Sequence, residues 1–562
     1  MYKKSVLFCL FMLAALILSA CSPSPAPAVT EAPVATEAPV ITEAPVVTEA
    51  PVVTEAPVVT EAPTEATPKV LKIASAAAIT TWDPVLSFST EVAYMNNMYE
   101  QLLRINPPGS AEKFTPLLAE SWESNEDGTV WTFHLRPNVK FHDGEPLTGE
   151  AVKMSIEAIA DHGGAAFIWW MLDNVEVVDD LTVKFNLTSS APIDWVASSA
   201  DGSRIISPKA LAAAAADPAY FETGVDAGTG PYVLESYKPD QELVFTRFED
   251  YWGGWKEGQY DTVYVQLVTE GITQQQLLDG GQVDLVTTIP RENVATYKDN
   301  PNFTYIEEPS MYNYLVFFNT LRPPLDNILV RQALSYAMPY NDIINIAVKG
   351  LGTQARGPVP KGVWPYSEEV PQYTYDLDKA ETLLKQAGYP DGGFTLTMWY
   401  VSNNDTSVAL VPLIKDSFAQ IGVDVTLVPM LWSPLWEQAK ADPANSYDML
   451  PTVYWPTYAD AGSDNLWSLF YWTESPFFNL SFWKNDTYNT LIDEAISLTV
   501  KDPATSQAKY IEAMKILVDE APGAYLFDTK AVFIIPKYIE GFKYNMNYPF
   551  VPYFYYELTS TN

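Results

Sequence analysis

The chain has 562 residues and a formal net charge of −37 at pH 7, with 33 lysines and arginines against 70 aspartates and glutamates. Hydrophobic residues make up 48% of the chain and charged residues 18%, which is the composition of a globular protein. A chain this acidic repels phosphate backbones, so the charge argues against nucleic acid as a partner.

The first 20 residues have the pattern of a secretory signal peptide. Lys3 and Lys4 precede an apolar run that is shorter than the roughly 20 residues of a transmembrane span. Residues 18–21, LSAC, resemble the bacterial lipobox, which implies that Cys21 carries lipid and becomes the mature N-terminus. The alternative is a free cysteine beside an ordinary cleavage site. We predict an extracytoplasmic protein on the periplasmic or outer face, held to the cell membrane through Cys21, without an internal disulfide because Cys9 lies in the leader.

Residues 21–68 have the composition of a spacer. Thr-Glu-Ala-Pro recurs every six residues, and seven glutamates are spread along the segment. Proline at this density disfavours helices and sheets, and the glutamates repel one another. We therefore predict a disordered, extended linker that follows the lipidated cysteine.

The remaining region, residues 69–562, keeps a formal charge of −32 once the two leader lysines and the seven linker glutamates are left out. It is too long for a single hydrophobic core, so two or three domains are expected. Strand and helix patterns are interspersed along it, which predicts a mixed α/β fold.

The strand patterns are clearest in the first half of this region. Residues 129–136 alternate between polar and apolar side chains, and residues 175–187 have the pattern of a hairpin that turns at Asp179 and Asp180. The apolar side of the first strand is expected to face a core, and it consists of Trp131, Phe133 and Leu135.

Three helices are predicted from caps and from a 3.6-residue apolar period. Thr148 is expected to cap the first, and Asp326 the second, over residues 327–338. The third lies within residues 375–392, with an acidic start and a stop at Gly388. The side chains expected to face the core are Val152, Ile156, Ile159, Val330, Ala333, Leu334, Ala337, Leu377, Ala380, Leu384 and Ala387.

Motifs of common enzymes are missing from the sequence. It contains no G-x-S-x-G, C-x-x-C, H-E-x-x-H or phosphate-loop pattern, and its three histidines stand apart from one another. No metal-ligand cluster stands out either. We expect neither catalysis nor a cofactor, and His142 in the FHDG turn is interpreted as structural. A secreted hydrolase with two carboxylates remains an alternative because acids are so numerous.

Seven segments stand in a recognisable order and spacing between residue 70 and the C-terminus. They include LLAESWESNEDGTVWTFHLRPNVKFHDGEPLTGEAVKMSIE (117–157), GTGPYVLESYKPDQELVFTRFEDYWGG (228–254) and YNYLVFFNTLRPPLDNILVRQALSYAM (312–338), together with 281–285, 375–392, 421–425 and 486–495. In these segments the chain resembles the family 5 extracytoplasmic solute-binding proteins of ABC importers. That family includes oligopeptide-, dipeptide-, nickel- and some oligosaccharide-binding proteins.

The resemblance implies a two-lobed periplasmic-binding-protein fold of the class with an extra inserted domain, a hinge between the lobes and a ligand in the interlobe cleft. Domain I is expected at 70–104, 216–311 and 524–562, the inserted domain II at 105–215, and domain III at 312–523. The implied function is to bind a small solute, an oligopeptide or an oligosaccharide, and to deliver it to the permease subunits of an ABC importer. We expect a monomer. A tethered sensor on the same fold is a further alternative.

In peptide-binding relatives, a stretch that runs from a tryptophan to an aspartate lines the cleft, and this aspartate receives the α-ammonium group of the peptide. Matched on Trp455, the stretch reads WPTYADAGSDNL, and Thr457 or Tyr458 stands at the position of that aspartate. Asp460 corresponds better to a second, turn-forming acid. The usual ammonium anchor is therefore predicted to be missing, which weakens the case for a peptide with a free N-terminus.

Aromatic residues supply most of the other expected ligand contacts, because their faces also stack on sugar rings. For each of them the alternative is ordinary packing in a core. The candidate ligand-binding residues are Trp455, Pro456, Thr457, Tyr458 and Asp460, Trp82 and Asp83 in TTWDP, Phe167, Trp169 and Trp170 in AAFIWWML, and Trp432.

Overall fold

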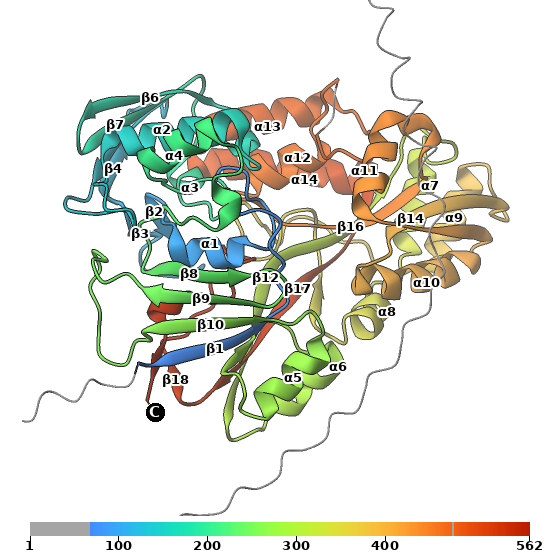
Figure 1. The fold of residues 1–562 in the computed structure, drawn as a ribbon. Coiled ribbons are helices and arrows are strands. Elements are labelled where there is room, and N and C mark those ends of the chain that lie inside the picture. Colours follow the sequence, from blue (N-terminus) through green and yellow to red (C-terminus); the bar gives the residue numbers. More distant parts are fainter. Residues whose placement is uncertain (1–67, 475–476, 562) are drawn as a thin grey trace, which may run out of the picture. The chain divides into compact units, whose positions relative to one another are not determined.

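The structure is a computed structural model that describes residues 68–474 and 477–561. The predicted signal peptide, Cys21 and the repeat segment lie outside these residues. Within them, three sheets of four, five and six strands are interspersed with helices, as Figure 1 shows. The prediction of a mixed α/β fold is confirmed.

The five-stranded sheet combines parallel and antiparallel strands in the order β11-β1-β10-β9-β8. Its first strand is parallel to β10 and β11, while β8 and β9 form an antiparallel pair with β9 next to β10. Helix α1 (Val92–Met98) is buried along its whole length. The remaining bounds are β1 (Val70–Ser75), β8 (Tyr232–Lys238), β9 (Glu242–Arg247), β10 (Thr262–Leu267), β11 (Leu285–Val286) and α5 (Gly271–Asp279).

The four-stranded antiparallel sheet has the order β4-β5-β7-β6 and packs against helix α2. The predicted strand and hairpin are confirmed, although the hairpin turns at Asp180 and Leu181, one residue later than predicted. Phe133 is fully buried. Thr148 caps α2 as predicted, because its side chain accepts a hydrogen bond from the backbone N–H of Ala151. The bounds are β4 (Ala119–Ser124), β5 (Val130–Leu135), β6 (Leu172–Asp179), β7 (Thr182–Leu187), α2 (Gly149–His162), α3 (Ile193–Val196) and α4 (Pro208–Ala216).

The six-stranded sheet has the order β13-β17-β12-β16-β14-β15 and forms its own core with helices α7, α9 and α10. One predicted cap was wrong by one residue. Helix α7 is capped by Asn327, whose side chain accepts from the backbone N–H of Leu329, and not by Asp326. Both residue types are good caps, so a local pattern does not decide between neighbours. The bounds are β13 (Gly352–Gln354), β14 (Phe394–Val401), β15 (Val423–Met430), β16 (Met449–Tyr454), α7 (Ile328–Tyr336), α9 (Leu377–Gln386) and α10 (Asp405–Ala419).

Two long antiparallel strands connect the core of the five-stranded sheet with that of the six-stranded sheet. They are β12 (Phe303–Phe318) and β17 (Gly523–Pro536), which lie side by side at the centre of Figure 1. Their pairing shifts in register between Pro309 and Asn313. On the N-terminal side of this shift, Ile306 packs on the core of the five-stranded sheet, whereas the C-terminal end of β12 belongs to the core of the six-stranded sheet.

Four α-helices lie between β15 and β17 in the sequence. They are α11 (Trp432–Ala441), α12 (Trp467–Phe470), α13 (Asp486–Leu498) and α14 (Pro503–Glu520). Helices α13 and α14 pack on each other, and α12 lies near them in Figure 1. In the part of the chain that the structure describes, no helix has the length and apolar composition needed to cross a bilayer.

Candidate functional site

A cavity of about 440 Å³ is enclosed by side chains from three distant parts of the chain. Two residues come from the loop before α1, one from the turn after α2, and the others from the six-stranded sheet and the helices around it. The lining residues are Phe88, Ser89, Phe167, Phe317, Val401, Asn404, Ser407, Trp432, Thr452, Val453, Tyr454, Trp455, Thr457, Leu469, Phe478 and Leu480.

Trp455 follows directly after strand β16 and forms one wall of this cavity. Its ring meets Phe550 edge-on at a centroid distance of 5.0 Å and Tyr312 at 5.7 Å, and it stacks on Tyr454 at 6.2 Å. Pairs of this geometry are favourable beyond the area they bury. The indole is therefore held by rings on one side while another part of it faces the cavity.

A buried carboxyl group fixes the backbone of the same wall. Asp464 accepts a hydrogen bond of 2.6 Å from the backbone N–H of Thr457 and one of 3.1 Å from the hydroxyl of Tyr454. Burial raises the pKa of Asp464 to about 7, because few waters remain to solvate its charge. Asp464 therefore orients two lining residues, because each of its carboxylate oxygens accepts a hydrogen bond from one of them.

The opposite wall is the loop that carries Phe88 and Ser89. The Phe167 ring meets Phe88 edge-on at 5.6 Å, so these two aromatic residues support each other. Beneath the loop lies Arg204, fully buried, whose Nη1 donates to the backbone carbonyls of Pro84 and Ser87 at 3.2 Å each. Arg204 thereby fixes the backbone of the segment that leads to Phe88.

The N-terminus of helix α10 borders the cavity on a third side. Asn404 is its cap and accepts a hydrogen bond of 2.9 Å from the backbone N–H of Ser407, and both residues line the cavity. Trp432, the first residue of α11, stacks on Trp436 at 5.6 Å and is 38% exposed. This side of the cavity combines neutral hydrogen-bonding groups with an accessible aromatic face.

Four of the eleven candidate residues line the cavity, and seven do not. Those that line it are Trp455, Thr457, Phe167 and Trp432. Pro456, Tyr458 and Asp460 are buried behind this wall, and Asp460 forms a turn by accepting from the backbone N–H of Gly462 and the hydroxyl of Ser463.

Two of the candidate tryptophans are core residues. Trp82 is 3% exposed and packs edge-on against Tyr237 at 5.2 Å. Trp169 is 2% exposed, donates a hydrogen bond of 2.7 Å to the carbonyl of Gly202, and stacks on a phenylalanine of β7. The last two candidates that do not line the cavity are Asp83, which is half-buried, and Trp170, which is exposed. Asp83 accepts from the backbone N–H of Val85 in a turn, and Trp170 is 45% exposed.

Several lining residues were not among the predicted ligand contacts. Phe88 and Ser89 stand only a few residues after the TTWDP segment, and Phe478 ends the aromatic-rich stretch FYWTESPFF. The turn SNND before α10 was a readable cap signal for Asn404. Phe317, Val401 and Leu469 gave no signal, because an apolar residue in a strand or helix has the same pattern whether it faces a core or a cavity.

The cavity is uncharged. Among the residues that the structure describes around it, the lining contains no Asp, Glu, Lys, Arg or His. In residues 68–474 and 477–561 no group of three or more His, Cys, Asp or Glu side chains is placed to hold a metal ion. The arrangement can therefore enclose a solute through aromatic and aliphatic contacts and a few neutral hydrogen bonds.

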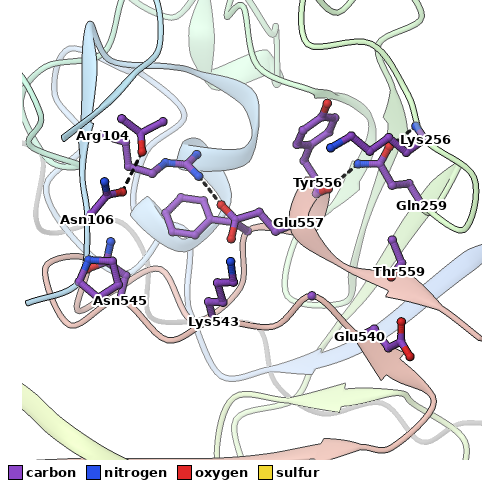
Figure 2. A pocket seen from close by; sticks show the side chains of 14 residues that line it. Arg104, Asn106, Lys256, Gln259, Glu540, Lys543, Asn545, Tyr556, Glu557 and Thr559 are labelled. Carbon is purple, nitrogen blue, oxygen red and sulfur yellow. Dashed lines mark hydrogen bonds and ion pairs between the residues drawn. The ribbon is translucent and has the colours of Figure 1, made fainter. Parts of the chain in front are cut away.

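A second cavity, of about 600 Å³, lies between strand β2 (Leu103–Ile105) and the C-terminal segment 540–559. Figure 2 shows Arg104 turned toward Glu557, with which it forms an ion pair, and its guanidinium lies 4.0 Å from the centre of the Phe554 ring. None of the described residues that line this second cavity belongs to the six-stranded sheet. We take the aromatic cavity as the candidate site, because it is bounded by parts of the chain on both sides of the β12–β17 connection.

Comparison with known proteins shows which family the chain resembles. Residues 113–476 match the family model "Bacterial extracellular solute-binding proteins, family 5 Middle". The chain is 30% identical over 495 residues to the "Probable D,D-dipeptide-binding periplasmic protein DdpA" of Escherichia coli strain K12, covering 85% of this chain and 92% of that protein. It is 29% identical over 445 residues to the "Glutathione-binding protein GsiB" of Pectobacterium atrosepticum, covering 76% and 83%.

Solved structures share the fold. The periplasmic binding protein DppA of Helicobacter pylori, solved in complex with peptide STSA, superposes with a TM-score of 0.72 at 26% identity, covering 88% of this chain and 98% of that one. The fold is that of a solute-binding protein with a two-lobed α/β architecture. The chain belongs to the bacterial extracellular solute-binding proteins of family 5. The predicted family and fold class are confirmed, and the matched relatives are binding proteins, not enzymes.

Proposed function

We propose that this protein captures a peptide-like solute in the cavity beside Trp455 and delivers it to the permease of an ABC importer. The observation that carries the proposal is the position of the cavity, which has walls from both sides of the β12–β17 connection. A solute there contacts both lobes at once. The relatives named for D,D-dipeptide and glutathione, and the structure that holds a tetrapeptide, support a peptide-like ligand.

The proposed working motion is a rotation of one lobe against the other at the two long strands. The register shift between Pro309 and Asn313 interrupts regular pairing there, and the expected boundary between domains I and III, at residues 311 and 312, falls within it. A solute that contacts both walls binds the closed arrangement more tightly than the open one, so it shifts the equilibrium toward closure. We propose 70–104, 216–311 and 524–562 as domain I, 105–215 as domain II and 312–523 as domain III.

We propose further that lipid on Cys21 anchors the protein and that the Thr-Glu-Ala-Pro segment is an extended linker between this anchor and the binding domains. The support is the LSAC motif after an apolar leader and the proline-rich, acidic repeat that follows it. Such a linker keeps the binding site close to a membrane-embedded permease while the site remains open to solutes in the surrounding solution. We also propose that the protein works as a monomer.

A test combines binding with transport. Purified protein is titrated with di- and tripeptides by calorimetry and thermal shift, and peptide uptake is measured in cells with and without the gene. Trp455→Ala should lower affinity by more than about tenfold, because aromatic residues at the centre of a site carry much of its binding energy. Trp170→Ala is the matched control, since this exposed tryptophan does not line the cavity. Turnover of any bound peptide, or normal uptake without the gene, would contradict the proposal.

An oligosaccharide is the second candidate solute. The observation that favours it is the aromatic, uncharged wall, because sugar rings stack on aromatic faces and need no charged anchor. Titrations with glycans under the same conditions distinguish the oligosaccharide from the peptide as the solute. Binding of glycans alone, lost in Trp455→Ala, would replace the peptide in the proposed function.

A further inference from the structure

We infer that the cavity selects a solute without formal charge, of the class of cyclic or end-blocked peptides with apolar side chains. This inference rests on the proposed function, because it names the ligand class of the same cavity. It follows from three features: the chemistry of the lining, the position of the neighbouring charged groups outside it, and the position of the hydrogen-bonding groups that remain free.

The lining is apolar with a few neutral polar groups. Eleven of its sixteen residues have aliphatic or aromatic side chains, and the other five are Ser, Thr or Asn. Among the described lining residues, the Tyr454 hydroxyl is the only titratable group, and burial raises its pKa well above its usual value. A free α-ammonium or α-carboxylate that entered this cavity would lose its hydration and find no opposite charge in the wall.

Three charged groups bond to lining residues or to their direct neighbours in the chain. Glu91 is buried and accepts a hydrogen bond of 3.1 Å from the backbone N–H of the lining residue Ser89. Asp464 lies behind the wall and accepts from the backbone of Thr457 and the hydroxyl of Tyr454. Arg291 donates a hydrogen bond of 2.7 Å to the hydroxyl of Thr406, next to the lining residue Ser407. Glu91, Asp464 and Arg291 all stand outside the described lining, so a peptide terminus inside the cavity meets none of these charges directly.

The free hydrogen-bonding groups suit a neutral amide. The hydroxyls of Ser89 and Ser407 and the Nδ2 of Asn404 have no partner among the described residues, while the Oδ1 of Asn404 is used as the helix cap. Two of these groups lie at the N-terminus of α10, where the helix dipole favours an acceptor such as a carbonyl oxygen. Asp405 in the first turn already supplies the negative charge that this helix end favours, so a second anion is not needed.

The experiment varies charge on one dipeptide. Calorimetry at pH 7.5 compares neutral cyclo(Leu-Phe) and N-acetyl-Leu-Phe-amide with cationic Leu-Phe-amide, anionic N-acetyl-Leu-Phe and zwitterionic Leu-Phe. We expect each neutral compound to bind at least tenfold more tightly than the zwitterion. Zwitterionic or singly charged ligands that bind as tightly as the neutral pair would overturn the inference. Trp455→Ala should weaken each binding event that the wild type shows, and this loss would assign the binding to this cavity.

A charge placed in the lining provides a second measurement. Asn404→Asp introduces a carboxylate at the cavity and keeps the helix cap, because Asp and Asn cap equally well. We expect it to bind cationic Leu-Phe-amide at least threefold more tightly than the wild type does. Asn327→Asp makes the same change at the cap of α7, away from the cavity, and should leave affinity unchanged. Equal affinities in Asn404→Asp and the wild type would show that charge in the lining does not govern selection.

The outcomes separate this inference from the proposed function. Binding of charged peptides that depends on Trp455 would leave the proposed function intact and overturn the inference. Binding of neutral glycans in preference to every peptide derivative would overturn the assigned ligand class. If no solute stabilises the protein and uptake does not depend on it, the proposed function fails, and the inference fails with it.

Discussion

The hydroxyl of Ser199 donates a hydrogen bond of 2.8 Å to the backbone carbonyl of Thr457, 258 residues further along the chain. Ser199 belongs to the proposed domain II and Thr457 to the cavity wall in the proposed domain III. The same two regions also meet through the rings of Phe167 and Phe477, whose centroids are 5.1 Å apart. These contacts hold the cavity wall against the opposite lobe.

Ser199→Ala is expected to weaken ligand binding without unfolding the protein. The variant loses one hydrogen bond across the lobes, worth about 1 kcal/mol, or about fivefold in affinity. It also loses the bond that the hydroxyl accepts from the backbone N–H of Asp201 within its own lobe. Ser198→Ala is the matched control, because its hydroxyl is equally buried but bonds to Trp195 within the same lobe. Calorimetry with any bound solute measures the difference. Equal losses of affinity in both variants would show that the bond to Thr457 has no part in closure.

Trp169→Ala is expected to lower stability and to spare the site. Its indole is buried in the core beside Phe185, and substitutions of this type cost about 3–5 kcal/mol. Urea unfolding should show this loss, while the solute affinity of the folded fraction stays within about twofold of the wild type. Trp455→Ala should instead lower solute affinity with little loss of stability. Loss of affinity at Trp169 with unchanged stability would contradict its assignment to the core.

Asp464 is expected to make the protein more stable under mildly acidic conditions. Burial raises its pKa from 3.8 to about 7, so the folded state binds this proton more tightly than the unfolded state. The contribution to the free energy of unfolding is therefore complete below pH 3.8 and is lost as the pH rises toward 7. Urea unfolding at pH 5 and pH 8 should show a larger difference for the wild type than for Asp464→Asn.

A control fits this pH experiment. Asp173 is exposed on β6, so Asp173→Asn should keep the wild-type dependence on pH. Asp201 and Asp528 are also buried, and burial raises the pKa of each to about 7, so part of the dependence should persist in Asp464→Asn. An identical pH dependence in Asp464→Asn and the wild type would count against the raised pKa.

Cys21→Ala is expected to release the protein from the membrane fraction. If lipid on Cys21 is the anchor, the variant loses it, whereas Cys9→Ala in the leader keeps the LSAC motif and should stay membrane-bound. Fractionation followed by immunoblotting measures the distribution. Membrane retention of Cys21→Ala equal to that of the wild type would refute lipidation at this position.

The sequence by itself determined the elements and the family. The cap at Thr148, the alternating strand at residues 130–135 and the helix within residues 375–392 follow from interactions among neighbouring residues, so a local pattern contains them. Trp455 was identified through the order and spacing of long segments, which carry the family resemblance.

Only the tertiary structure decided which aromatic residues face the cavity. Trp82, Trp169 and Trp455 look alike in sequence, yet the first two pack in cores and only the third lines the cavity. Likewise, nothing local indicates that Phe88 and Asn404 meet around one space. A cavity is defined by side chains that are distant in sequence, and its shape depends on how separate cores are joined, which no short segment encodes.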